Sequence, residues 1–165
     1  PIMWGQTPIH MMAFYATTPV FDGEEDRNGL RNADEIALWR YYLDGQLEAP
    51  APDAPFIVIG DANLDPHDGD GRIEEMQSFL ADPRLQDPQP HSIHAQSLAN
   101  ETHTGDAALD TADWGDPVPG NLRVDYVLPS ADLKVIDAGV SWSSASNSDG
   151  ALFRHGLVWV DVARQ

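Results

Sequence analysis

A carboxylate and an amide stand two residues apart directly after a continuous apolar run, Phe56-Ile-Val-Ile59. The segment that carries them is Gly60-Asp61-Ala62-Asn63. In an extended chain the side chains of Asp61 and Asn63 share one face. At the carboxyl end of a buried strand, where α/β sheets commonly bind ligands, this pair could hold a water molecule, a phosphoryl oxygen or a divalent cation. Glycine, aspartate and asparagine are also ordinary turn residues, so a plain turn is the alternative.

Two further segments supply a guanidinium, a second carboxylate and an imidazole. In Arg123-Val-Asp-Tyr-Val127 the apolar residues alternate, which predicts a strand with Arg123 and Asp125 together on its other face. His155 stands at the start of the last apolar run. There it could act as a general acid or base, with Asp125 fixing its tautomer and raising its pKa. A structural ion pair and a structural histidine are the alternatives.

Residues 65–71, Asp-Pro-His-Asp-Gly-Asp-Gly, look like a calcium loop, but their spacing is wrong for an EF-hand. When Gly71 is aligned with the required glycine of that loop, the two anchoring positions fall on Pro66 and Gln77, so both anchoring carboxylates are missing. The sequence also contains no Walker loop, no Gly-x-Ser-x-Gly elbow and no His-Glu-x-x-His motif.

The composition limits the class of protein. The chain of 165 residues has 9 basic and 27 acidic side chains, which gives a formal charge of −18, and it has no cysteine. This charge argues against a protein whose whole surface coats nucleic acid or an acidic membrane. The lack of cysteine excludes disulfides, thiolate metal sites and cysteine nucleophiles. No apolar run approaches the ~18 residues of a membrane span.

Apolar periodicity predicts a layered domain of the α/β or α+β class. We expect strands over residues 8–16, 56–59, 122–128, 133–142 and 156–163, and helices over 33–47 and 72–81. Asn32 followed by Glu35 has the spacing of a capping box, which predicts that the first helix begins there. Residues 82–121 lack periodicity and predict a long ordered loop, which in a compact domain is usually functional.

Taken in order, these motifs resemble the endonuclease/exonuclease/phosphatase superfamily, the metal-dependent phosphoesterases that include deoxyribonuclease I. Its Gly-Asp-x-Asn box matches residues 60–63, its Arg-x-Asp-Tyr box matches 123–126, and its terminal Ser-Asp-His box corresponds to 153–155. Residues 19–32, Pro-Val-Phe-Asp-Gly-Glu-Glu-Asp-Arg-Asn-Gly-Leu-Arg-Asn, and residues 120–130 are similar to a bacterial branch of that superfamily. The resemblance covers roughly residues 9–162.

The resemblance implies a role for each matching side chain. Asp61 is expected to orient or deprotonate the attacking water, and Asn63 to hold a phosphate oxygen. His155 is expected to stabilise the phosphoryl transition state or to act as acid or base, with Asp125 behind it. Tyr15 falls where relatives place a histidine or tyrosine that contacts the phosphate, and a half-buried strand aromatic is the alternative for it.

The metal and phosphate ligands depart from the family pattern. The carboxylate that relatives carry just before the histidine is replaced here by Arg154, which cannot ligate a cation but can bind a phosphate; Arg123 is the other expected phosphate ligand. Metal binding is then assigned to Asp61, Asn63 and His155, with the main ligands expected in a first half that this chain does not match. The cofactor implied is Mg²⁺, with Mn²⁺ or Ca²⁺ as alternatives.

The resemblance also implies a partial domain. The superfamily fold is a four-layer αββα sandwich, and residues 1–165 correspond to its C-terminal half: one mixed, mostly antiparallel sheet with outer helices. The chain begins at Pro1 without an initiator methionine, so we expect a processed chain or a piece of a longer one. The inner sheet face should then lack a cover, and we expect the chain alone to be unstable or inactive unless a missing half or another copy covers that face.

The expected function is divalent-metal-dependent hydrolysis of phosphoesters, of the nuclease or the phosphatase/phosphodiesterase type, by in-line attack of water, with nucleic acid as an alternative substrate. Four of the nine basic residues (Arg27, Arg31, Arg123 and Arg154) fall in the motifs, which favours a local anion site and a small or flexible phosphoester over long nucleic acid. Alternatives are a non-catalytic phosphate-binding or scaffold protein on the same fold, and an acidic secreted protein without a phosphate role. The resemblance favours a periplasmic or extracellular location, with the cytoplasm left open, and no membrane partner.

Overall fold

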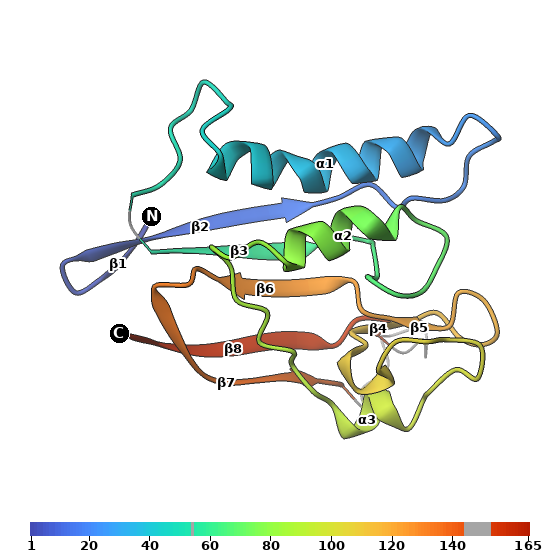
Figure 1. The fold of residues 1–165 in the computed structure, drawn as a ribbon. Helices are drawn as coiled ribbons and strands as arrows, with labels where there is room; N and C mark the ends of the chain where they lie inside the picture. The colour runs from blue at the N-terminus through green and yellow to red at the C-terminus, as the bar shows by residue number, and fades with distance from the viewer. Residues whose placement is uncertain (54, 144–152) are drawn as a thin grey trace.

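The computed structural model describes residues 1–53, 55–143 and 153–165. Its strands are β1 (Ile2–Trp4), β2 (Thr7–Tyr15), β3 (Phe56–Asp61), β4 (Ala112–Asp113), β5 (Asn121–Leu122), β6 (Asp125–Pro129), β7 (Leu133–Ser141) and β8 (Leu157–Arg164). One sheet has the order β1-β2-β3-β6, with β2 and β3 parallel and the other pairs antiparallel. The antiparallel hairpin of β7 and β8 lies alongside β6 (Figure 1). This mainly antiparallel sheet with few helices confirms the predicted α+β class.

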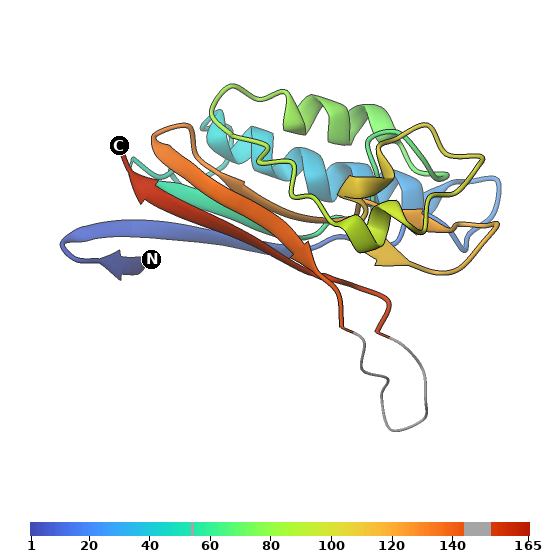
Figure 2. The ribbon, with the colours of Figure 1, turned by 90° about the horizontal axis from the view of Figure 1, so that it is seen from below.

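Two helices, α1 (Arg27–Leu43) and α2 (Ile73–Leu80), lie on the same face of the sheet (Figure 2). The core between helices and sheet contains Ile36, Val58, Met76, Phe79, Tyr126 and Leu128. Burial of each large apolar side chain contributes about 1.5–3 kcal/mol, so this layer is the main source of stability. Among the described residues, no helix is long and apolar enough to cross a lipid bilayer.

The opposite face of the sheet has no second layer among the described residues (Figure 2). Along β2, Met11 and Tyr15 are 38% and 72% exposed, whereas Met12 is only 7% exposed. In β3, Ile57 is partly exposed and its neighbour Val58 is fully buried. Because side chains alternate between the two faces of a strand, the exposed set lines the uncovered face. An uncovered face is what we expected of half a sandwich, and that the chain is such a half stays a prediction.

The start of α1 differs from the sequence prediction. The helix begins at Arg27 rather than near residue 33, because Asp26 adopts a left-handed conformation with a φ of 49° and ends the preceding loop. Asn32 therefore lies inside the helix and cannot be its cap, and Glu35 cannot complete a capping box. A side chain that can cap a helix can equally bind backbone elsewhere, and the spacing alone does not separate the two cases.

Asn32 and Glu35 join α1 to the segments that follow β2 and β3. Asn32 is fully buried, and its Nδ2 donates to the carbonyl oxygens of Thr17 and Ala62 at 2.7 and 2.8 Å. Glu35 accepts a hydrogen bond of 2.6 Å from the backbone N–H of Thr17. These contacts hold the ends of both parallel strands against the helix, next to Asp61 at the end of β3.

The long segment 82–121 is mostly loop, as predicted, but it contains short elements. These are α3 (Ile93–Gln96), a 3₁₀ turn (Ala107–Leu109) and β4, which pairs with β5. That pairing explains why β6 begins at Asp125 rather than at residue 122: Asn121 and Leu122 bond to β4 instead of β3. Ala112 of β4 also forms a bridge with His155, so the ribbon of β4 and β5 reaches the end of the sheet.

The carboxylate of Asp65, only 4% exposed, organises the loop that follows β3. Its Oδ1 accepts the backbone N–H groups of His67 and Asp68 at 2.7 and 3.0 Å. Its Oδ2 accepts the backbone N–H of Arg123 at 2.6 Å. One buried side chain therefore links the loop after β3 to the segment that leads into β6. Burial raises the pKa of Asp65, and the three hydrogen bonds oppose that rise.

Asp110 gives the folded chain a pH-dependent weakness. It is 7% exposed, and its carboxyl group accepts a hydrogen bond from Nδ2 of Asn121. Burial, followed by the charges of Asp65 and Asp68, raises its pKa from 3.8 to about 8. The folded state therefore holds a proton that the unfolded state has lost between these two pH values. Stability must fall as the pH rises through that window, by at most about 1.4 kcal/mol for each pH unit.

We expect Asp110→Asn to remove this pH dependence, because asparagine stays neutral and keeps an acceptor for Asn121. Its melting temperature should exceed that of the wild type at about pH 8 and approach it near pH 4. Thermal unfolding followed by circular dichroism measures both values. Asp34→Asn, an exposed position on α1, is the matched control and should show no such trend. An equal difference at both pH values would contradict the assignment.

Candidate active site

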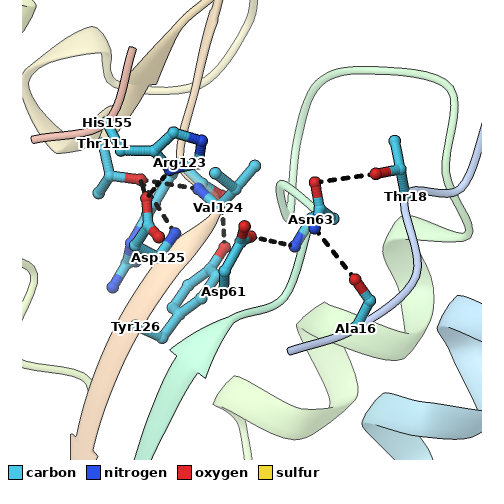
Figure 3. Close-up of polar contacts among 10 residues, drawn as sticks. All are labelled: Ala16, Thr18, Asp61, Asn63, Thr111, Arg123, Val124, Asp125, Tyr126 and His155. Carbon is cyan, nitrogen blue, oxygen red and sulfur yellow. Dashed lines mark hydrogen bonds and ion pairs between the residues drawn. The ribbon is translucent and has the colours of Figure 1, made fainter. Parts of the chain in front are cut away.

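Asp61 and Asp125 face each other at the end of the sheet. Asp61 is the last residue of β3 and Asp125 the first of β6, and the two are partners in the antiparallel register. Tyr15, the last residue of β2, is the partner of Asp61 on its other side. Paired residues point to the same face, and alternation with the buried Val58 and Tyr126 places these three side chains on the uncovered face. His155 lies just before β8 and completes the cluster (Figure 3).

A hydrogen-bonded chain fixes the orientation of His155. Its Nδ1 lies 2.9 Å from Oδ2 of Asp125. The same oxygen accepts a hydrogen bond of 2.8 Å from Oγ1 of Thr111, which is fully buried. Oγ1 of Thr111 in turn accepts the backbone N–H groups of Val124 and Asp125 at 3.0 and 2.9 Å. With Nδ1 bound to Asp125, Nε2 is the ring nitrogen left for a substrate.

Thr111 was not found by sequence analysis, and neither was Trp114. The Trp114 ring meets the His155 ring edge-on, with centroids 5.4 Å apart. Both residues come from the long segment 82–121, which has no periodicity, so nothing in the sequence aligned them with a distant histidine. Contacts with residues distant in sequence, including the bridge between β4 and His155 and the bonds of Thr111 to Asp125, bring them to the site.

The environment of the cluster raises the pKa of both Asp61 and His155, so each holds a proton to a higher pH than it would in water. Burial raises the pKa of Asp61, and the nearby charge of Asp125 adds to that rise. The hydrogen bond that His155 donates to Asp125 raises the pKa of His155 above its ordinary 6.5. His155 therefore stays an imidazolium to a higher pH than a free histidine, and its stabilising interaction with Asp125 is lost as the pH rises through that raised pKa. An imidazolium beside two carboxylates offsets part of their mutual repulsion.

Asn63 shapes the loop beside the cluster. It has a left-handed φ of 47°, and its backbone N–H donates to Oδ1 of Asp61 at 2.8 Å. Its Nδ2 donates to the carbonyl of Ala16 at 3.0 Å, and its Oδ1 accepts from Thr18 at 3.3 Å. The amide oxygen, the atom that would ligate a cation, is thus turned to Thr18. The expected role of Asn63 as a phosphate ligand stays a prediction.

Arg123 does not share the face of Asp125, contrary to the predicted alternation. Its guanidinium lies 4.8 Å from the centroid of the buried Tyr126 ring and binds Asp87 with two nitrogens, one at 2.8 Å. The residue is only 4% exposed. The reason is that the chain between β5 and β6 leaves the sheet at this point, so a strand pattern of alternation does not apply. Arg123 is a structural cation on the helix side of the sheet.

Tyr15 and Arg154 remain near the cluster and accessible. Tyr15 is 72% exposed and stands in register with Asp61. Arg154 is exposed, and its backbone carbonyl accepts the N–H of Asp113 at 2.8 Å. Within the part of the chain that the structure describes, the Arg154 guanidinium forms no ion pair. Its assignment to phosphate binding, like that of Tyr15, stays a prediction.

Three side chains form a donor set that fits a divalent cation. Ligand atoms of Asp61, Asp125 and His155 lie within 4.8 Å of one another. Carboxylate oxygens suit hard cations such as Mg²⁺, which bind through one or two carboxylates and keep several water or phosphate ligands. The uncovered face leaves room for those ligands. Asp125 joins Asp61 and His155 in this set, and the expected role of Asn63 as a metal ligand stays a prediction.

A comparison with models of protein families identifies the family of this chain. A model of the endonuclease/exonuclease/phosphatase family matches residues 4–149. The chain belongs to this family. Asp61 and Asp125 lie inside the match and His155 lies just after it. The finer assignment to a bacterial branch stays a prediction. None of the curated proteins matches the chain significantly.

Solved structures share the fold at low sequence identity. A family protein from Beutenbergia cavernae is 18% identical, with a TM-score of 0.53 over 91% of this chain and 34% of its own. A mannosyl-6-phosphatase from Bacteroides thetaiotaomicron is 15% identical, with a TM-score of 0.56 over 93% of this chain and 50% of its own. Sphingomyelinase C from Streptomyces griseocarneus is 19% identical, with a TM-score of 0.50 over 94% and 51%. The chain thus spans about a third to a half of the length of these proteins.

Replacing Asp125 should lower the pKa of His155. In Asp125→Asn the imidazolium loses its charged partner, so we expect the pKa to return toward 6.5. A titration of the histidine ring protons by NMR measures this without any assay of activity. Asp137→Asn, an exposed carboxylate on β7, should leave the titration unchanged. An unaltered pKa in the Asp125 variant would show that their contact does not control the protonation of His155.

Proposed function

We propose that this chain carries part of the catalytic site of a divalent-metal-dependent phosphoester hydrolase. The observation that carries the proposal is the meeting of Asp61, Asp125 and His155 at one edge of the sheet in a member of the endonuclease/exonuclease/phosphatase family. The fold shared with a mannosyl-6-phosphatase and a sphingomyelinase supports the same reaction type.

Each member of the cluster has a task in such a reaction. Asp61, whose pKa is raised, accepts a proton from the attacking water and orients it toward phosphorus. The oxygen–phosphorus bond to water forms as the bond to the leaving alcohol breaks. His155, held by Asp125, donates a hydrogen bond or proton from Nε2 to the phosphoryl group or the leaving oxygen. Tyr15 is placed to donate to a phosphoryl oxygen from the neighbouring strand.

A divalent cation would be held by the carboxylates of Asp61 and Asp125, and when bound it would polarise the phosphoryl oxygens and offset their charge. His155 would not be a ligand in the same state, because its Nδ1 is bound to Asp125 and its Nε2 donates to the phosphoryl group. We propose Mg²⁺, because two carboxylates and an open coordination sphere suit it. Mn²⁺ and Ca²⁺ accept the same donors. These two carboxylates leave other coordination positions to water, substrate or ligands from outside this chain.

A second candidate function is phosphate-ligand binding without hydrolysis. Arg154 favours it, because it stands where the family pattern has a carboxylate next to the histidine, and an arginine binds phosphate but no cation. This alternative predicts heat of binding for a phosphate ester in calorimetry together with no release of phosphate. Release of phosphate under the same conditions would exclude it.

The uncovered sheet face belongs to the same proposal. The face carries exposed apolar residues and borders the cluster, and the similar structures are two to three times as long as this chain. We propose that a further layer, from a missing half of the protein or from another copy, covers this face in the active form. We propose a periplasmic or extracellular location for the enzyme.

Replacing the acid–base groups should abolish most of the turnover. In the intact protein we expect His155→Ala and Asp61→Asn each to lower turnover of a phosphodiester such as bis(p-nitrophenyl) phosphate by about 10²–10⁴-fold. Both positions are at least partly exposed, so the melting temperature should change little. His94→Ala, outside the cluster, is the matched control. Near-normal turnover of either site variant would exclude the assignment.

Removal of divalent cations should also abolish activity. Excess chelator should bring turnover to background, and added Mg²⁺ or Mn²⁺ should restore it, because the two carboxylates then regain their counter-charge. Calorimetric titration of the apo protein with Mg²⁺ should show binding that Asp125→Asn weakens. Full activity in excess chelator would require a metal-free mechanism.

A further inference from the structure

A pocket of about 210 Å³ adjoins the cluster at the same end of the sheet. Its walls come from three segments: the loop after β2, the loop after β3, and the ribbon of β4 and β5. Two lining residues are shared with the site. Asn63 donates its backbone N–H to Asp61, and Trp114 contacts the His155 ring. A group bound in this pocket would therefore lie next to a phosphate held at the cluster.

The walls of the pocket are mainly apolar. Pro19, Phe21, Leu64, Trp114, Leu122 and Val124 supply most of the surface. Leu64, Leu122 and Val124 are buried and pack in the core clusters, so this part of the wall is rigid. A cavity of about 150 Å³ accommodates benzene, which means that a pocket of this size takes one ring rather than a whole metabolite. The pocket thus suits part of a ligand whose remainder lies outside it.

The charges around the pocket disfavour a second phosphate. Among the described residues that line it, none is basic, whereas Asp65, Asp68 and Asp70 are acidic. Asp65 and Asp68 already accept backbone N–H groups, Asp68 from Thr104 and Gly105 at 2.8 Å each. No basic residue of the lining balances the negative charge of these carboxylates at the wall, so the pocket disfavours anions. It therefore favours an uncharged or cationic group.

Phe21 stands at the mouth of the pocket in an unusual conformation. It is 91% exposed although it lines the pocket, and its φ is 70°. A non-glycine residue in the left-handed region costs about 1–3 kcal/mol, and such residues concentrate at ligand clamps. An exposed aromatic ring held there lacks any packing role in the core, so it is free to cover an apolar group that enters.

We propose that this pocket binds the alcohol portion of the substrate, and that this portion is an uncharged, ring-sized group with an apolar face. The proposal rests on the proposed function, because it assigns the phosphate to Asp61, Asp125 and His155. It selects esters of ring-bearing alcohols with a single phosphate group over polyphosphates and long nucleic acids, whose further phosphates would meet the acidic wall.

A comparison of two esters tests the pocket. In the intact protein, kcat/KM is measured for benzyl phosphate and ethyl phosphate, whose alcohols leave with similar ease. Phe21→Ala and Val20→Trp, the second of which fills the pocket, should each lower kcat/KM for benzyl phosphate about tenfold and change that for ethyl phosphate less than about twofold. Ile93→Ala, at an 88% exposed position that does not line the pocket, is the matched control and should affect neither ester. Equal losses for both esters would overturn the proposal.

A binding measurement separates this proposal from the proposed function. Benzyl alcohol, which has no phosphate, should shift the NMR signal of the Trp114 indole N–H in a saturable way, and Val20→Trp should abolish the shift. If the shift occurs but neither these esters nor bis(p-nitrophenyl) phosphate is hydrolysed, the pocket stands and the proposed hydrolase function fails. If hydrolysis occurs without any saturable shift, the pocket proposal fails and the hydrolase function stands. If Val20→Trp does not fold, Phe21→Ala still provides the test, because replacing an exposed side chain should leave folding intact.

Discussion

The antiparallel register of β3 and β6 places Asp61 opposite Asp125, and the other features of the site depend on that pairing. In the same ladder Val58 pairs with Leu128, and both are buried against the helices. A slip of β6 by one residue against β3 would turn Leu128 outward and Asp125 into the core, at a cost of several kcal/mol. The core therefore fixes the register, and the register brings the two acids together. Gly60 contributes as well, since a Cβ there would lie 2.1 Å from the carbonyl oxygen of Phe14 on β2.

The two carboxylates of the site repel each other, and neighbouring groups offset part of that repulsion. Two carboxylates that face each other on a partly buried surface raise the energy of the ionised state. His155 reduces that cost as an imidazolium, and Thr111 holds Asp125 in place with a hydrogen bond to one oxygen. A divalent cation would reduce it further. The neighbouring pocket is lined by other acidic residues, so under our proposals charge would divide the site into a phosphate region and a neutral region.

The sequence predicts most of the sheet, because buried strands and helices leave periodic apolar patterns. Asp61, Asp125 and His155 could be found because each directly adjoins a strand. The helix start was wrong, since Asn32 bonds to distant backbone rather than to its own helix. Arg123 was placed on the wrong face, because a break between β5 and β6 is invisible to alternation. Thr111 and Trp114 could not be predicted, because long-range bridges rather than local patterns bring the segment 82–121 to His155.

The cluster and the uncovered apolar face lie on the same side of the sheet, and this has a thermodynamic consequence. Any layer that packs on that face must also form a boundary of the phosphate region. Occupation of the cluster by cation and ester and docking of that layer are then linked equilibria, each favouring the other. The apparent affinity for the ester would depend on the concentration of the covering partner, and the ester itself would promote assembly. In that case, binding of the ester and association of the two layers would be steps of a single coupled equilibrium on the same sheet face.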